Sequence, residues 1–141
     1  LIKSYIQYKH KFSNRFVVTS GIYSQFMSLC KHTSVEPRVG LKYSLSKNQS
    51  VSIGYGLHSQ TQVRPAYFYQ TVLPDGSIYL SNKNLDLTYS NQFVAGYDYL
   101  ISNNMRVKLE SYYQYLTNIP VKNGFPEYSL INSGDDFYLS L

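Results

Sequence analysis

Residues 103–115 read NNMRVKLESYYQY, and from the third residue onward apolar and polar side chains alternate. Val107 and Leu109 share one parity, whereas Arg106 and Lys108 share the other. Because successive side chains of a β-strand point to opposite faces, this stretch predicts a strand with one apolar and one charged face. The alternation alone does not say which face meets water, because a soluble sheet and a membrane barrel produce the same local pattern.

The composition narrows the class of protein. The chain has 141 residues, of which 43% are hydrophobic, 16% aromatic and only 15% charged. Soluble domains carry about 25% charged residues, so we expect a charge-poor surface. The net charge is +5, but Lys and Arg are spread singly along the chain, which argues against a nucleic-acid site. Cys30 is the only cysteine, so no intramolecular disulfide is possible, and we interpret it as a free loop thiol.

Strand patterns come in pairs along the chain, and no stretch shows a convincing helical stripe. Short connections rich in Ser, Asn and Lys join the members of each pair, and longer connections separate the pairs. Strands of about ten residues exceed the usual five or six of globular sheets and match a tilted strand that crosses a bilayer. The sequence therefore predicts an all-β antiparallel meander of about six long strands, a segment of a transmembrane β-barrel. The expected strands are residues 2–11, 16–26, 37–45, 51–60, 92–101 and 105–116.

In this interpretation the apolar parity of each strand faces lipid and the polar parity faces the lumen. Turning a Lys or Arg to lipid at the midplane would cost about 2–4 kcal/mol, which fixes the orientation. Packing in the core of a β-sandwich is the alternative interpretation of the apolar parity. The residues predicted to face lipid are Val39, Leu41, Tyr43, Val51, Ile53, Tyr55, Phe93, Tyr97, Tyr99, Val107, Leu109 and Tyr113. The residues predicted to face the lumen are Arg38, Lys42, Asp98, Arg106, Lys108 and Glu110.

The sequence contains no motif of a catalytic site. Paired carboxylates in a strand context, HExxH, GxSxG and the P-loop are all missing, so neither an enzyme nor a metal or cofactor site is predicted. Asp135 and Asp136 could bind a cation, although two neighbouring acids in a loop are more often simply solvated.

Candidates for ligand contact lie in the long connection that follows residue 60. Its aromatic residues beside an Arg could stack on a sugar, an aromatic siderophore or a peptide side chain. The alternative is that the loop packs on itself. The candidates are Arg64, Tyr67, Phe68 and Tyr69, together with His58 near the end of the preceding strand.

Five segments carry a resemblance to a known family. They read EPRVGLKY from Glu36, SIGYGLHSQ from Ser52, NKNL from Asn82, FVAGYDY from Phe93 and ESYYQYLTNIPV from Glu110. In this order and spacing they resemble the C-terminal part of the β-barrel of TonB-dependent outer-membrane receptors of Gram-negative bacteria. The branch most similar is the one that often carries a carboxypeptidase-regulatory-like N-terminal domain. The resemblance covers nearly the whole chain.

The resemblance implies a large barrel of about 22 strands with a plug domain inside. Residues 1–141 would then be a fragment of one barrel domain, without the plug and the N-terminal region that contacts TonB. The lumenal charges would face the plug, and the whole protein would take up a scarce nutrient (siderophore, glycan, peptide or vitamin) through the outer membrane. Its partners would be outer-membrane lipid, its own plug, TonB and the nutrient ligand.

Two alternatives to this interpretation remain at the level of the sequence. One is a secreted or surface β-sandwich that binds glycans. The other is a small closed barrel, against which we note that both ends of the chain fall inside strand patterns. That feature leads us to expect a piece of a longer polypeptide, whose open sheet edges would favour aggregation in isolation.

Overall fold

The computed structural model of the protein describes residues 1–122 and 125–129. The chain divides into two compact units, which we describe separately. The first unit comprises Leu1–Phe26, Thr33–His58 and Ser90–Tyr115 and contains most of six long strands. The second unit comprises Met27–His32, Ser59–Tyr89 and the residues from Leu116 onward, so it contains mainly the longer connecting segments.

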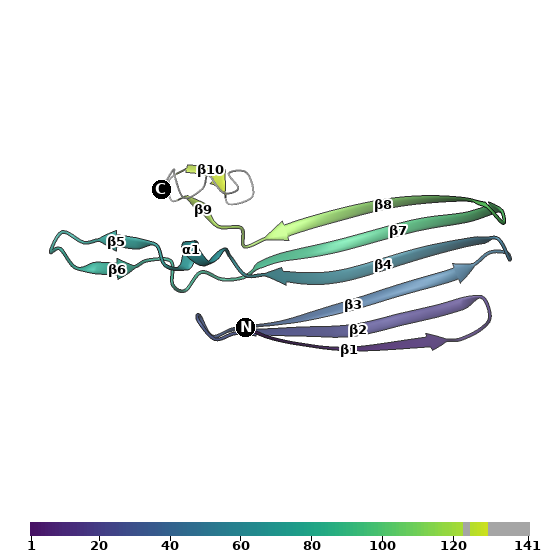
Figure 1. Ribbon diagram of the computed structural model, residues 1–141, viewed down its shortest axis with the longest axis horizontal. Helices are drawn as coiled ribbons and strands as arrows, with labels where there is room; N and C mark the ends of the chain where they lie inside the picture. The colour runs from purple at the N-terminus through teal and green to yellow at the C-terminus, as the bar shows by residue number, and fades with distance from the viewer. Residues whose placement is uncertain (123–124, 130–141) are drawn as a thin grey trace. The chain divides into compact units, whose positions relative to one another are not determined.

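The first unit is built on one six-stranded sheet (Figure 1), in which the strands lie in the order β1-β2-β3-β4-β7-β8. Long strands that follow one another in the chain therefore lie side by side, and the predicted antiparallel meander of about six long strands is confirmed. The sheet leaves β1 and β8 as its two edges. The strands are β1 (Ile2–Lys11), β2 (Phe16–Met27), β3 (His32–Ser44), β4 (Gln49–Gln60), β7 (Thr88–Ser102) and β8 (Met105–Thr117).

Four short connections join strands of the sheet, and the one between β2 and β3, residues 28–31, is shorter than the sequence predicted. Serine hydroxyls shape the other three turns. In each turn a serine Oγ accepts a hydrogen bond from the backbone N–H two residues later, which is the local bond that favours serine in turns. Backbone bonds also fasten two of the turns to a neighbouring strand, from Ser44 N to the Arg15 carbonyl and from Leu100 N to the Asn48 carbonyl, both at 2.8 Å. The serine bonds run from Arg15 N to Ser13 (3.1 Å), from Asn48 N to Ser46 (3.2 Å) and from Asn104 N to Ser102 (3.4 Å).

Three strands begin earlier than the sequence predicts, although β4 does so by only two residues, at Gln49. β3 starts at His32, whereas the prediction placed its start at Pro37, because proline lacks the N–H of a ladder bond and often opens a strand. In the structure Pro37 lies inside β3. β7 starts at Thr88 rather than at residue 92, since the polar residues before Gln92 continue the alternation instead of forming a loop.

The second unit contains short elements that the sequence interpretation treated as loop. α1 (Arg64–Tyr67) is followed by a two-stranded hairpin of β5 (Gln70–Val72) and β6 (Ile78–Leu80), and β9 (Val121–Lys122) pairs with β10 (Phe125–Ser129).

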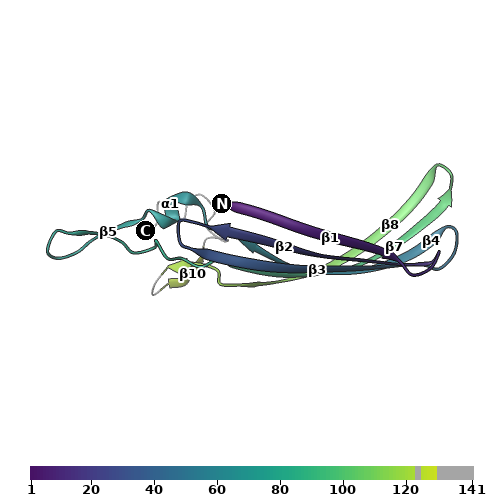
Figure 2. The same cartoon turned by 90° about the horizontal axis from the view of Figure 1, so that it is seen from below.

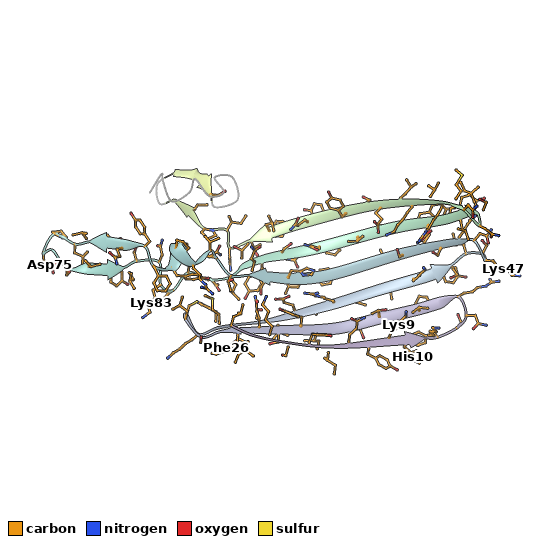
Figure 3. All side chains as sticks on the ribbon, in the orientation of Figure 1. Lys9, His10, Phe26, Lys47, Asp75 and Lys83 are labelled. Carbon is orange, nitrogen blue, oxygen red and sulfur yellow. The ribbon has the colours of Figure 1, made fainter. Side chains whose placement is uncertain are left out.

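Its β5–β6 hairpin turns at Asp75 and Gly76, and Figure 3 labels Asp75 at its tip. Gly76 has a φ of 79°, a left-handed conformation that glycine adopts without steric cost. The Asp75 carboxylate accepts hydrogen bonds from the Ser77 backbone N–H at 2.9 Å and from the Ser77 hydroxyl at 2.6 Å. These bonds, made to the charged form, hold the pKa of Asp75 below its usual value.

Buried apolar side chains are found only in the second unit, among the residues that the structure describes. They are Ala66, Tyr67 and Leu87. The six-stranded sheet accordingly has no apolar core of its own within residues 1–122 and 125–129, and Figure 2 shows its strands as a single curved layer. A β-sandwich would place a second sheet over one of its faces.

Candidate functional site

The register of β3 and β4 separates the side chains of the sheet into two faces. Val39 lies opposite Tyr55, so these two apolar residues share a face, as do the pairs Leu41–Ile53 and Tyr43–Val51. Arg38 lies opposite Gly56 on the other face, where the pairs Gly40–Gly54 and Lys42–Ser52 follow. We call these the apolar face and the polar face. The division that the sequence predicted is therefore found in the structure, although contact with lipid stays a prediction.

The same two faces continue onto β1 and β2. The Arg38 guanidinium lies over the ring of Tyr23 at 5.1 Å, which places Tyr23 and its partner Tyr5 on the polar face. Ile6 and Ile22 are paired at the neighbouring position and therefore lie on the apolar face.

The apolar face carries a row of aromatic rings and is open to its surroundings. The Phe93 ring lies 4.9 Å from that of Tyr55 and 6.4 Å from that of Tyr113, so the row crosses β4, β7 and β8. The Tyr55 hydroxyl donates a hydrogen bond of 2.8 Å to the Asn91 side chain. Ile53 is 60% exposed and Leu109 is 63% exposed. All twelve residues predicted to face lipid have the strand parity of this face.

The polar face contains the buried side chains of the sheet. Gln25, Ser34, Glu36 and Ser90 are each at most 9% exposed, and all four lie on this face. Of these four, Glu36 is 1% exposed. Its carboxylate accepts a hydrogen bond of 3.2 Å from the Ser34 hydroxyl and another of 3.1 Å from the Arg38 guanidinium. Burial of an ionised carboxylate is tolerated because both of its oxygens are hydrogen-bonded and one partner is a cation.

Four of the other charges predicted to line the lumen pair with one another along β7 and β8, whereas Lys42 on β3 forms no ion pair among the described residues. Both oxygens of the Asp98 carboxylate accept hydrogen bonds from the Arg106 guanidinium, a bidentate arrangement that fixes both side chains. Lys108 lies two residues from Glu110 on the same strand, and its ammonium is 2.7 Å from that carboxylate. The structure thus brings opposite charges together on the polar face of two adjacent strands.

His58 is half-buried and lies on the polar face beside Gly56. A Cβ atom added to Gly56 would lie only 2.9 Å from the His58 Nε2 atom, so the absence of a side chain at Gly56 makes room for the imidazole. The prediction that His58 contacts a ligand is not tested by this arrangement.

In the second unit, Tyr67 departs from the role suggested for it. Its side chain is fully buried and its hydroxyl accepts a hydrogen bond of 3.1 Å from the Gln62 backbone N–H. Burial raises the pKa of this hydroxyl above its ordinary value. A side chain in this position cannot stack on a ligand from solvent, so for Tyr67 the structure supports self-packing of the loop. Arg64 and Phe68 are exposed and Tyr69 is half-buried, so their contact with a ligand stays a prediction.

A hydrogen-bond network fastens together three connecting segments of the second unit. Asp86 contributes most: its Oδ1 atom lies 3.4 Å from His32 Nδ1, and its Oδ2 atom accepts a bond of 3.3 Å from the Asn118 amide. The Gln62 side-chain amide donates to the Asp86 carbonyl at 3.1 Å and to the Thr88 hydroxyl at 2.9 Å. Sequence reasoning missed Gln62, Asp86 and Asn118, because no local pattern signals a network between residues so far apart in the chain.

Three findings concern the metal-ligating and cysteine residues considered from the sequence. Among the described residues, no group of three or more His, Cys, Asp or Glu side chains is placed to hold a metal ion. Asp135 and Asp136, considered above as a cation site, lie outside the described residues. Cys30 is a half-buried free thiol.

No helix in the described part of the chain has the length and hydropathy needed to cross a membrane.

Comparisons of the chain with protein-family models, with curated proteins and with solved structures found no match.

Proposed function

We propose that this chain is part of the β-barrel of a TonB-dependent outer-membrane transporter, which takes up a scarce nutrient through a plugged barrel. The observation that carries the proposal is the inverted polarity of the six-stranded sheet. Its buried side chains, Glu36 among them, are polar and lie on the polar face, whereas Ile53 and Leu109 on the apolar face are exposed.

The energetics favour a lipid environment for this arrangement. Burying a Leu or Ile side chain stabilises a protein by about 1.5–3 kcal/mol, and a water-soluble sheet would gain this by covering its apolar face. A bilayer supplies the cover instead, because hydrocarbon chains contact every outward side chain of a barrel strand. The polar face would then line the lumen, where Arg38, Asp98 and Arg106 meet opposite charges rather than lipid.

Strand length and topology support the same proposal. The six strands contain between 10 and 15 residues, enough for a tilted crossing, which takes about 9–11. Short turns join β1 to β2, β3 to β4 and β7 to β8, and a long segment joins β4 to β7, as in outer-membrane barrels. The connection between β2 and β3, residues 28–31, is short as well and does not fit a strict alternation. A glycan-binding sandwich, the alternative function, buries apolar side chains between two sheets, and the described residues of the six-stranded sheet include no buried apolar side chain.

Membrane fractionation combined with heat-modifiability tests the proposal. The protein, as the native cell makes it, should sediment with the outer membrane. After detergent extraction it should migrate faster on SDS gels when unboiled than when boiled, because a closed barrel resists SDS. A protein that stays in the soluble fraction and shows no heat shift would contradict the proposal, and glycan binding around Phe68 and Tyr69 would then be examined.

A further inference from the structure

A small hollow beside the turn between β3 and β4 has no role in the proposal above. Its volume is about 290 Å³, and it lies on the polar face at the short-turn end of the sheet. Figure 3 labels Lys47 on this turn. The residues that line it include Lys42, Lys47, Arg106, Asp98, Ser44 and Ser50.

The charges around the hollow do not balance. Three cations line it against the single carboxylate of Asp98, and that carboxylate already accepts both of its hydrogen bonds from Arg106. Lys42 and Lys47 form no ion pair with any residue that the structure describes. The lining therefore holds two cations more than carboxylates, which suits a ligand of charge close to −2.

The neutral groups of the hollow are hydroxyl donors. Ser44 and Ser50 lie directly opposite each other in the ladder and share the face of Lys42. A hydroxyl rotates to donate to whichever oxygen is near. A phosphate group presents three strong acceptor oxygens and carries a charge of about −1.5 to −2 at neutral pH, so its charge and its acceptors both match this lining.

We propose that this hollow binds a phosphate group, carried either by a free phosphate or phosphomonoester or by the headgroup of an anionic lipid. Lys42 and Lys47 would supply the charge, and Ser44 and Ser50 would donate hydrogen bonds to the oxygens. The proposal needs only the six-stranded sheet, so it does not depend on the sheet being part of a barrel.

Isothermal titration calorimetry of the folded, purified protein with inorganic phosphate tests the site. Replacing both Lys42 and Lys47 with alanine should raise the Kd for phosphate by about tenfold or more, because two charge-assisted bonds are lost. The matched control replaces Lys9 and Lys11, which lie on the polar face of β1 outside the hollow. This control removes the same charge and should change the Kd less than about twofold.

A variant with the opposite expected effect distinguishes a binding site from a structural role. Asp98→Asn removes the only carboxylate of the hollow and releases Arg106, so phosphate should bind several-fold more tightly. A lining with a merely structural role would give no gain. An unchanged far-UV circular dichroism spectrum of each variant would show that its fold is retained.

The source of the phosphate group is resolved by repeating the titration in mixed detergent micelles with phosphatidylglycerol or with zwitterionic phosphatidylcholine. Binding that depends on Lys42 and Lys47 in free phosphate supports a soluble ligand, and the same dependence only with phosphatidylglycerol supports a lipid headgroup. The proposal would be overturned if the two double-lysine variants lost the same affinity for phosphate. It would also be overturned if binding of neither ligand depended on Lys42 and Lys47. Fractionation with heat-modifiability reports on the barrel independently of these results.

Discussion

At the scale of single residues, Glu36 expresses the inverted polarity of the sheet most clearly. Its carboxylate is almost fully removed from solvent, yet it lies on the face that also carries the exposed Lys42. A comparison with Glu110 is informative, because both acids lie on the polar face and pair with a cation two residues away. The two pairs differ in burial, since the Glu110 side chain is 49% exposed.

We predict that Glu36→Gln lowers the free energy of unfolding by about 1–3 kcal/mol, because a buried hydrogen-bonded charge is lost and Arg38 keeps an uncompensated cation. Glu110→Gln should cost less than about 1 kcal/mol, as exposed ion pairs generally do. Denaturant titration of the two variants beside the wild type measures both values. Equal losses would show that the burial of Glu36 has no energetic consequence.

Tyr67 anchors the first part of the long connection, and its hydroxyl makes the stability of this segment depend on pH. The folded pKa lies above the unfolded value of about 10, so the neutral hydroxyl stabilises the segment fully below pH 10. This contribution is lost as the pH rises through the raised folded pKa. We predict that proteolytic cleavage within residues 59–89 accelerates at alkaline pH in the wild type.

Tyr67→Phe is the matched variant for that measurement. It should be cleaved faster than the wild type at neutral pH, because the Gln62 N–H loses its acceptor, and its cleavage should show a flatter pH dependence. Tyr69→Phe, at a half-buried position, should behave as the wild type does. An identical pH dependence in Tyr67→Phe and the wild type would rule out the Tyr67 hydroxyl as the titrating group.

At the scale of the element, the two faces of a strand should respond oppositely to charge. Ile53 and Val94 are both exposed aliphatic residues, but Ile53 lies on the apolar face and Val94 lies beside Gln92 and Glu110 on the polar face. In a bilayer, Ile53→Lys should cost about 2–4 kcal/mol if the position is near the midplane, whereas Val94→Lys should be nearly neutral. Unfolding titrations in liposomes measure both values, and a small effect at both positions would indicate that water meets both faces.

Most strands and the two faces of the sheet could be predicted from the sequence, because strand alternation is a local pattern. The parities of Val39, Leu41, Ile53 and Tyr55 follow from their spacing, and the ladder places them as expected. The starts of β3 and β7 could not be predicted in this way, because Pro37 resembles a strand start and Ser90 and Asn91 resemble loop residues. For those residues the ladder to neighbouring strands outweighs local preference.

The candidate site could be predicted from the sequence less well than the strands could. Asp86 joins His32 and Asn118, which lie 54 and 32 residues away in the chain, and no sequence pattern of period two or 3.6 links such positions. The burial of Tyr67 was also hidden, since neighbouring Phe68 has a similar ring and is exposed. Only its burial in the second unit, where Ala66 is also buried, distinguishes Tyr67 from Phe68.

At the scale of the whole molecule, the two edge strands determine how the chain behaves by itself. β1 and β8 each have one neighbour in the sheet, so each presents unpaired backbone N–H and C=O groups along a long strand. We predict that residues 1–141 produced alone aggregate in water and bind a cross-β dye. A soluble, monomeric and folded 1–141 chain, shown by light scattering and circular dichroism, would contradict this expectation.

The central claim, that the apolar face meets lipid and the polar face meets water, is tested most directly by spin labels placed in turn at residues 51–58 of β4. Cys30 is first replaced with serine so that each label has a unique site, and the protein is reconstituted in liposomes. We predict that collision with oxygen, which concentrates in lipid, is high at Val51, Ile53, Tyr55 and Leu57. Collision with a water-soluble nickel complex should be higher at the residues between them. Nickel accessibility at every position, without alternation, would contradict the account.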